Sequence, residues 1–117
     1  SIENVEPVET ELNKFKNNII DPTLIRVSNI TSTNENVVSK VEVRSKGGYL
    51  YNYITIYWKN KGGEFTESKV FRFPINPFED SQTIYVEGDI SDLMIVPINF
   101  RGGLFKFEEI LVTKFKN

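Results

Sequence analysis

Beyond residue 22, apolar and polar residues alternate along most of the chain with a period of two residues. Such alternation predicts β-strands with one buried face and one exposed face, because successive side chains of a strand point in opposite directions. Clusters of Gly, Asn, Pro and Asp interrupt the alternation and predict turns. The pattern therefore predicts seven strands, with breaks at 34–36, 46–48, 61–63, 74–80, 87–89 and 101–103.

The clearest predicted strand covers residues 37–45, where Val37, Val41 and Val43 share one face. Regularly spaced strands without intervening helices predict an all-β fold in which two antiparallel sheets pack as a sandwich. We expect residues 22–117 to form this single β-sandwich domain. A chain of 117 residues supports one hydrophobic core of ordinary size.

Residues 1–21 follow a different pattern. Val8, Leu12, Phe15 and Ile19 are spaced by four, three and four residues, which predicts a short N-terminal helix or a linker. The segment either packs a few apolar side chains on the sandwich or tethers it to a preceding domain. Residues 1–11 have neither a basic start nor an apolar stretch typical of a signal peptide. The chain starts without Met, so we expect it to be part of a longer protein.

Charge and apolar runs argue against two classes of partner. The chain carries 14 basic and 16 acidic residues, which are interspersed and give a net charge of -2. Binding to nucleic acid requires a dense patch of Lys and Arg, so we expect no nucleic acid partner. The apolar runs are much shorter than the ~20 residues that cross a bilayer, so we expect no membrane span.

The sequence contains no His and no Cys, which removes disulfides, common zinc sites and thiol nucleophiles. We expect no cofactor, no assigned metal site and no catalytic residue. Carboxylates are the remaining candidates for acid and base chemistry, but none stands in a distinctive motif, and charged residues on sheets are usually solvated. A calcium ion could use Asp21, Glu79, Asp80 or Asp89, although their spacing does not match an EF-hand. The nominal catalytic candidates are Glu64, Glu67, Glu79, Asp80, Glu108 and Glu109.

Near the C-terminus, the alternation changes phase at Glu108 and Glu109. Phe107 and Ile110 both belong to apolar faces although they are three residues apart, which predicts a β-bulge between them. Aromatic residues are frequent in the second half of the chain, and we expect them to form most of the core. They are Phe65, Phe71, Phe73, Phe100, Phe105 and Phe107.

The segment 49–59 is the most informative for function. Alternation places Leu50, Ile54, Ile56 and Trp58 on one face and Tyr49, Tyr51, Tyr53 and Tyr57 on the other. Because the aliphatic face needs a core, the tyrosines are expected to project from the outer surface of a sheet. The alternative is that a loop, the N-terminal segment or a partner chain covers them.

An exposed row of phenol rings suits a sugar ring, whose C–H groups stack on aromatic faces. Polar side chains near it would then bind the sugar hydroxyls. Phe78 lies in the loop 74–80 and either contacts a ligand or closes the open end of the core. The candidate hydrogen-bonding residues are Asn52, Arg72, Asn76 and Arg101.

Two stretches, YITIYWKNKGGEFTESKVFRF and QTIYVEGDISDLMIVPINFRGGLFKFEEILV, resemble the second half of jelly-roll, lectin-like domains of the carbohydrate-binding-module type. Such domains occur attached to bacterial glycosyltransferases that build surface polysaccharides. The resemblance covers residues 49–115. It includes the short motif from Gly63 to Glu67, which follows a strand that ends in a pair of aromatic residues. Pro97 and Asn99 stand where the family often has Arg and Asp-Pro.

These observations predict a non-catalytic carbohydrate-binding or substrate-positioning module of a larger, bacterial, glycan-active protein. Its expected partners are a polysaccharide and a neighbouring catalytic domain. The sequence leaves the compartment open between the bacterial cytoplasm near the membrane and the cell surface. The alternative is an assembly domain whose tyrosine face contacts a second copy of the chain or a neighbouring domain, since Tyr is enriched in interfaces.

Overall fold

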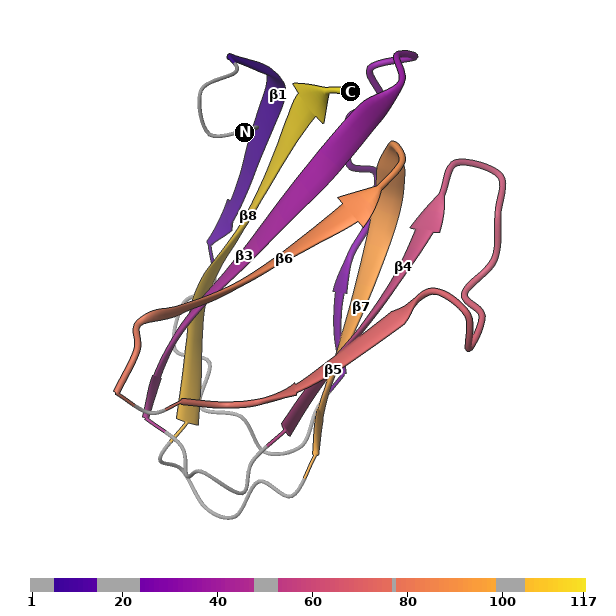
Figure 1. Cartoon of the computed structure of the whole chain (residues 1–117). Helices are drawn as coiled ribbons and strands as arrows, with labels where there is room; N and C mark the ends of the chain where they lie inside the picture. Colours follow the sequence, from indigo (N-terminus) through magenta and orange to yellow (C-terminus); the bar gives the residue numbers. More distant parts are fainter. Residues whose placement is uncertain (1–5, 15–23, 48–52, 77, 99–104) are drawn as a thin grey trace.

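The computed structural model describes residues 6–14, 24–47, 53–76, 78–98 and 105–117, and within them the regular structure consists of strands alone. Seven strands follow residue 22, as the alternation predicts, and one more precedes it (Figure 1). The strands are β1 (Pro7–Lys14), β2 (Ile25–Val27), β3 (Val37–Gly47), β4 (Tyr53–Asn60), β5 (Val70–Pro74), β6 (Ser81–Glu87), β7 (Ile90–Ile98) and β8 (Phe105–Lys116).

The strands form two antiparallel four-stranded sheets. The first sheet has the order β1-β8-β3-β6 and the second has the order β2-β7-β4-β5. The pairs β4–β5, β3–β6, β2–β7 and β1–β8 are nested, so the chain resembles one long hairpin that is folded over into two layers. This is the arrangement of an eight-stranded jelly roll. The predicted all-β, two-sheet sandwich is confirmed.

The core between the sheets is mainly aliphatic. Inward residues such as Val41, Ile54, Leu93 and Ile110 are fully buried. Branched aliphatic side chains suit this position because they pack well on the pleated surface of a sheet. The core therefore depends on valine and isoleucine more than on aromatic residues.

The expectation of a phenylalanine core is wrong for two of the four named residues whose side chains are described. Phe107 is fully buried and Phe73 packs against the core, but Phe71 is exposed on the edge strand β5 and Phe65 lies in a loop. An edge strand covers its inner face incompletely, so a large side chain there remains partly in solvent. Phe100 and the side chain of Phe105 lie outside the described residues.

The predicted β-bulge in β8 is confirmed. Arg44 of β3 pairs with Glu109 and Ser45 pairs with Phe107, so Glu108 is the extra residue. Phe107 and Ile110 are consequently both buried, although they are three residues apart. The extra residue reverses the alternation of the strand, so apolar residues on both sides of the bulge face the same core.

The predicted N-terminal helix is wrong over residues 7–14, which form β1 and pair with β8. Its inward positions are polar: Glu9, Glu11 and Asn13 share the face that the core residues of β8 use. Val8 and Leu12, the residues that suggested a helix, instead point outward and are 40% and 46% exposed. Inward charges protect a sheet edge from unwanted pairing, and they also remove the alternation that identifies a strand.

Candidate functional site

The outer face of the second sheet carries Tyr53 and Tyr57, as the alternation predicts for these two residues. Ile54 and Ile56 are fully buried and Trp58 packs against the core, so the other phase of β4 must face outward. Tyr53 is exposed at the start of β4, and Tyr57 is half-buried near its end. The predicted site residues Tyr49, Tyr51, Asn52 and Arg101 lie outside the described residues.

Cross-strand pairing determines the neighbours of Tyr57. Met94 of β7 lies on one side and Val70 of β5 lies on the other. Residues directly opposite each other on one face have Cβ atoms about 5 Å apart, so these side chains are in contact range. Two residues earlier, Thr55 stands between Val96 and Arg72 in the same way.

Thr55 lies between the two tyrosines on β4, and Arg72 of β5 is its cross-strand neighbour. The Arg72 Nε donates a hydrogen bond to Thr55 Oγ1 at 3.1 Å, and the Thr55 side chain is buried. Tyr53 and Tyr57 are four residues apart, which corresponds to about 13 Å along a strand. The two described tyrosines therefore do not form one continuous aromatic surface.

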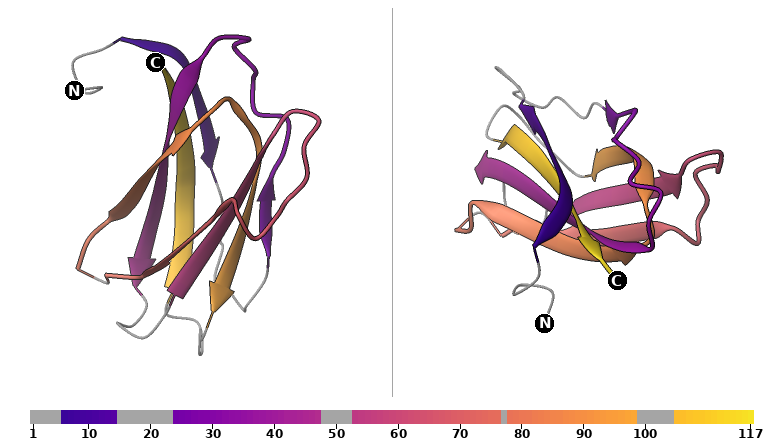
Figure 2. Two further views of the ribbon diagram at one scale, coloured as in Figure 1. Left: turned by 45° about the vertical axis from the view of Figure 1, so that its right-hand side comes forward. Right: turned by 90° about the horizontal axis from the view of Figure 1, so that it is seen from above.

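The loop 61–69, which connects β4 to β5, extends from the side of the sandwich (Figure 2). Gly62 has a φ of 79°, a left-handed conformation that favours glycine. The Gly63 N–H donates to the Asn60 carbonyl at 2.9 Å, and the Lys69 N–H donates to the Thr66 carbonyl at 3.3 Å. At its far end the loop rejoins the sheet, because the Trp58 N–H donates to the Lys69 carbonyl at 3.2 Å.

Two cations lie over the ring of Phe65 in this loop. The guanidinium carbon of Arg26 is 5.3 Å from the ring centroid, and the Lys59 Nζ is 5.5 Å from it. Cations within about 6 Å of an aromatic face are attracted by its negative quadrupole. Arg26 belongs to β2 and Lys59 to β4, so the two contacts hold the ring between the loop and the outer face of the sheet.

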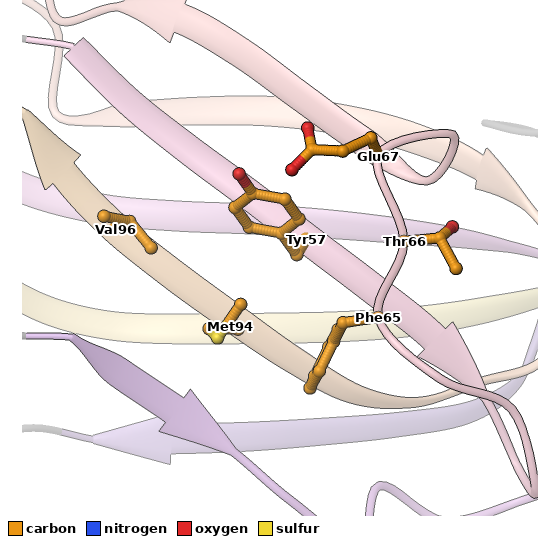
Figure 3. Close-up of a pocket in the computed structure, with 6 residues that line it drawn as sticks. All are labelled: Tyr57, Phe65, Thr66, Glu67, Met94 and Val96. Carbon is orange, nitrogen blue, oxygen red and sulfur yellow. The ribbon is translucent and has the colours of Figure 1, made fainter.

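Phe65 and Tyr57 are part of the wall of a hollow of about 440 Å³ on this outer face (Figure 3). Met94 and Val96 supply its β7 side, and the loop supplies Thr66 and Glu67. In Figure 3 the Glu67 carboxylate extends towards the Tyr57 hydroxyl, whereas the Phe65 ring lies nearer to Met94. We name this feature the outer-face hollow; it is lined by Tyr57, Phe65, Thr66, Glu67, Met94 and Val96.

Sequence reasoning identified Tyr57 but missed the rest of the outer-face hollow. Phe65 was expected in the core, since a single aromatic residue after a glycine turn carries no sign of its direction. A signal did exist in β7, where residues 93–98 are all apolar. A continuous apolar run indicates a strand whose two faces are both covered. Here Leu93 and Ile95 face the core, and Met94 and Val96 face the hollow.

The remaining predicted ligand residues lie in the β5–β6 loop and outside the residues that line the hollow. Asn76 Oδ1 accepts a hydrogen bond from the Phe78 N–H at 3.0 Å, which stabilises a turn. Phe78 is 87% exposed, so the alternative in which it closes the core is wrong. Ile75, from the same loop, is fully buried and belongs to the core cluster.

The nominal catalytic carboxylates fall into two groups. Glu64, Glu67, Glu79 and Asp80 are exposed. Glu109 pairs with Arg44 at 2.7 Å, and Glu108 Oε2 is 3.9 Å from Lys46 Nζ. These pairs line a second hollow of about 280 Å³ on the outer face of the first sheet, which also includes Asp80.

Asp89, a candidate calcium ligand, instead binds a buried lysine. The side chain of Lys114 is only 1% exposed, and its Nζ donates to Asp89 Oδ1, to the Thr31 carbonyl at 2.5 Å and to the Ile90 carbonyl at 2.9 Å. Asp89 Oδ2 accepts from Ser32 Oγ at 2.7 Å and from the backbone N–H of residue 33 at 3.0 Å. We name this group the Lys114 cluster.

The Lys114 cluster changes the acidity of Asp89. Burial alone would raise the pKa of this carboxyl, but the hydrogen bonds from Lys114, Ser32 and the Thr33 backbone together outweigh burial and lower the pKa below its ordinary value of 3.8. The carboxylate form is therefore favoured, and its charge is matched by the ammonium group. Within the described ranges, no three residues among His, Cys, Asp and Glu are placed to hold a metal ion.

Comparisons of the chain with protein-family models, with curated proteins and with solved structures give no match. In the part of the chain that the structure describes, no helix has the length and apolar character needed to cross a membrane.

Proposed function

We propose that this domain is a non-catalytic carbohydrate-binding or substrate-positioning module of a larger, bacterial, glycan-active protein. In this proposal the outer-face hollow receives a saccharide ring. The observation that supports it most directly is the combination of apolar walls from Tyr57, Phe65 and Met94 with polar groups at the rim.

The chemistry of the lining suits a sugar. A pyranose ring presents C–H groups on its faces and hydroxyl groups around its edge, so it needs both apolar contact and hydrogen-bonding partners. Each aromatic contact contributes about 0.5 to 1.5 kcal/mol beyond area burial. The Tyr57 hydroxyl and the Glu67 carboxylate, which lie near each other in Figure 3, are the polar groups that would bind the sugar hydroxyls in this proposal.

Two features favour binding over hydrolysis. Glycoside hydrolysis generally uses two carboxyl groups about 5 to 9.5 Å apart. Among the described residues that line the outer-face hollow, Glu67 is the one carboxylate. The sequence also lacks His, the residue most suited to proton transfer near neutral pH.

A shallow site of this kind binds weakly, because association costs several kcal/mol before any net gain appears. Tethering to a catalytic domain would compensate by raising the effective concentration of the site near a polymeric ligand. The proposed partners are therefore a polysaccharide and a neighbouring catalytic domain of the same protein.

The proposal is tested by NMR titration with hexasaccharides of β-1,4-linked glucose, α-1,4-linked glucose and N-acetylglucosamine. We expect at least one of them to shift the signals of residues around Tyr57 and Met94. Phe65→Ala should weaken that binding by about tenfold, since it removes one stacking face.

Phe78→Ala is the matched control, because it deletes an equally large ring that is exposed outside the hollow. It should leave the dissociation constant unchanged. An effect of Phe78→Ala without an effect of Phe65→Ala would reject the outer-face hollow as the site. No signal shift with any of the saccharides would reject the carbohydrate proposal.

An assembly role is the second candidate. It is favoured by Val8 and Leu12, which expose apolar side chains on the outer face of the first sheet. The contact would be with a second copy of the chain. Sedimentation equilibrium checks this: a monomer at all concentrations contradicts assembly, whereas a dimer that Leu12→Lys dissociates supports it.

A further inference from the structure

The hydrogen bonds of the Lys114 cluster continue into the loop 61–69, and Asn60 is the link between them. Asn60 Nδ2 donates to the Asp89 carbonyl at 3.2 Å, and Asn60 Oδ1 accepts from Lys69 Nζ at 2.7 Å. The Asn60 carbonyl also accepts the bond from the Gly63 N–H. One residue therefore contacts the β6–β7 turn and both ends of the loop.

The position of Asn60 is closely constrained by its neighbours. The β4–β7 register shifts at this point, since Lys59 pairs with Asp92 whereas Asn60 pairs with Ile90. On the other side, a Cβ atom added to Gly88 would lie 2.9 Å from Asn60 Nδ2. The amide group thus occupies space that is free only because residue 88 is glycine.

The other end of this chain of contacts is held in the protein interior. Asp89 is fixed by the buried ammonium group of Lys114, and the Gly88 N–H donates to the Val37 carbonyl at 3.0 Å. Ser39 Oγ donates to the Gly88 carbonyl at 2.7 Å. The β6–β7 turn is consequently attached to β3 and β8. The Asp89 carbonyl that Asn60 binds is therefore held in place.

We infer that Asn60 is a positioning residue for the outer-face hollow. By joining Asp89 to Lys69 it orients the loop that places Phe65 and Glu67 beside Tyr57. A wall that is ordered before the ligand arrives lowers the entropy lost on binding. The consequence for binding depends on the proposed function, whereas the ordering of the loop does not.

The test compares Asn60→Ala with the wild type by hydrogen exchange and NMR. The reporting amides are those of Trp58, Gly63 and Lys69, which are hydrogen-bonded at the ends of the loop. We expect at least one of these amides to exchange about tenfold faster, because Asn60→Ala removes both side-chain bonds. The ring signals of Phe65 should move towards those of an unfolded chain.

Ser32→Ala is the matched control. It removes a 2.7 Å hydrogen bond to the side-chain carboxylate of Asp89, whereas Asn60 binds the backbone carbonyl of the same residue. It should leave the exchange of the loop amides and the Phe65 signals unchanged. Should Asn60→Ala fail to fold, Lys69→Met removes only the outer bond, and Lys69→Arg, which retains a donor, should restore the wild-type signals.

The outcomes separate this inference from the proposed function. Wild-type exchange and Phe65 signals in both Asn60→Ala and Lys69→Met would overturn the inference. A loosened loop in a protein that binds none of the hexasaccharides supports the positioning role and rejects the carbohydrate proposal. A loosened loop with an unchanged dissociation constant for a bound hexasaccharide would overturn the role of Asn60 in binding.

Discussion

Two clusters of opposite charges involve strand β8, and they differ in their surroundings. In the Lys114 cluster, the ammonium group is enclosed and binds Asp89 and two backbone carbonyls. In the other, which we name the Arg44 cluster, the exposed Arg44 pairs with Glu109 at 2.7 Å and lies 3.9 Å from Glu42. The first joins loops that are distant in sequence, whereas the second joins neighbouring positions of one sheet.

The difference shows that the same type of ion pair has two roles in this fold. A buried charge must keep all its partners, so the Lys114 cluster constrains the segments that supply them. An exposed pair exchanges its partners with water at little cost, so the Arg44 cluster mainly keeps the outer face of the first sheet polar. Four measurements test this contrast.

Lys114→Met should have the largest effect. It leaves Asp89 and two carbonyl groups without their cation, and such a loss typically lowers the free energy of unfolding by about 3 to 5 kcal/mol. Chemical denaturation measures the change. Lys116→Met makes the same substitution at an exposed position of β8 and should stay within about 0.5 kcal/mol of the wild type. Equal effects of the two variants would contradict the contrast.

Gly88→Ala should come next, with a loss of about 2 to 3 kcal/mol. Gly88 has a φ of 109°, and an added Cβ would displace the hydrogen-bonded Asn60 amide. Gly62→Ala is the matched control, since Gly62 also has a positive φ but has no atom within 4 Å of the added Cβ. It should cost about 1 kcal/mol. A larger loss for Gly62→Ala would show that packing around Asn60 is loose.

The pH dependence should be smaller and specific to the Lys114 cluster. The pKa of Asp89 is lower in the folded protein than its ordinary value of 3.8. The unfolded state therefore binds more protons between these two values, and the stabilisation from Asp89 is complete above 3.8 and disappears as the pH falls through the folded pKa. Denaturation at a series of pH values should show this extra loss in the wild type and not in Asp89→Asn. If the stability of the wild type and that of Asp89→Asn fell in parallel with pH, Asp89 would not be the source of the extra loss.

Arg44→Ala should have the smallest effect, within about 0 to 1 kcal/mol, because about half of the Arg44 side chain is exposed to water, which screens the pair. Added salt should reduce even this difference, as expected for a screened surface pair. Chemical denaturation at low and high ionic strength provides the measurement. A salt-independent loss comparable to that of Lys114→Met would place the Arg44 cluster among the structural contacts.

Much of the fold could be predicted from the sequence where one face of a strand is apolar. The direction of Ile54, Ile56 and Trp58 and the bulge at Glu108 follow from alternation alone, because the core accepts only apolar side chains. Strand β1 could not be recognised in this way. Its inward residues are polar, and it is defined by backbone pairing with β8, a partner about one hundred residues away in the chain.

The candidate site was only partly predictable for a related reason. Tyr57 could be placed on the outer face, but Phe65 reaches the same hollow through a loop whose path depends on Asn60 and on two cations. The buried position of Lys114 could not be predicted from the sequence either. Lys114 occupies an inward position in line with Ile110 and Val112, where a lysine is unexpected unless a carboxylate and carbonyl groups are brought to it from elsewhere.

The pairing of β1 with β8 also determines how this domain can be attached to other polypeptide. Pro7 lies opposite Phe115, so the chain enters and leaves the sandwich at one corner of the first sheet. The outer-face hollow belongs to the other sheet. A domain with neighbouring entry and exit points can be inserted into a surface loop of a host protein as readily as it can be joined end to end. In either architecture, the connecting segments would start from the sheet that does not carry the outer-face hollow.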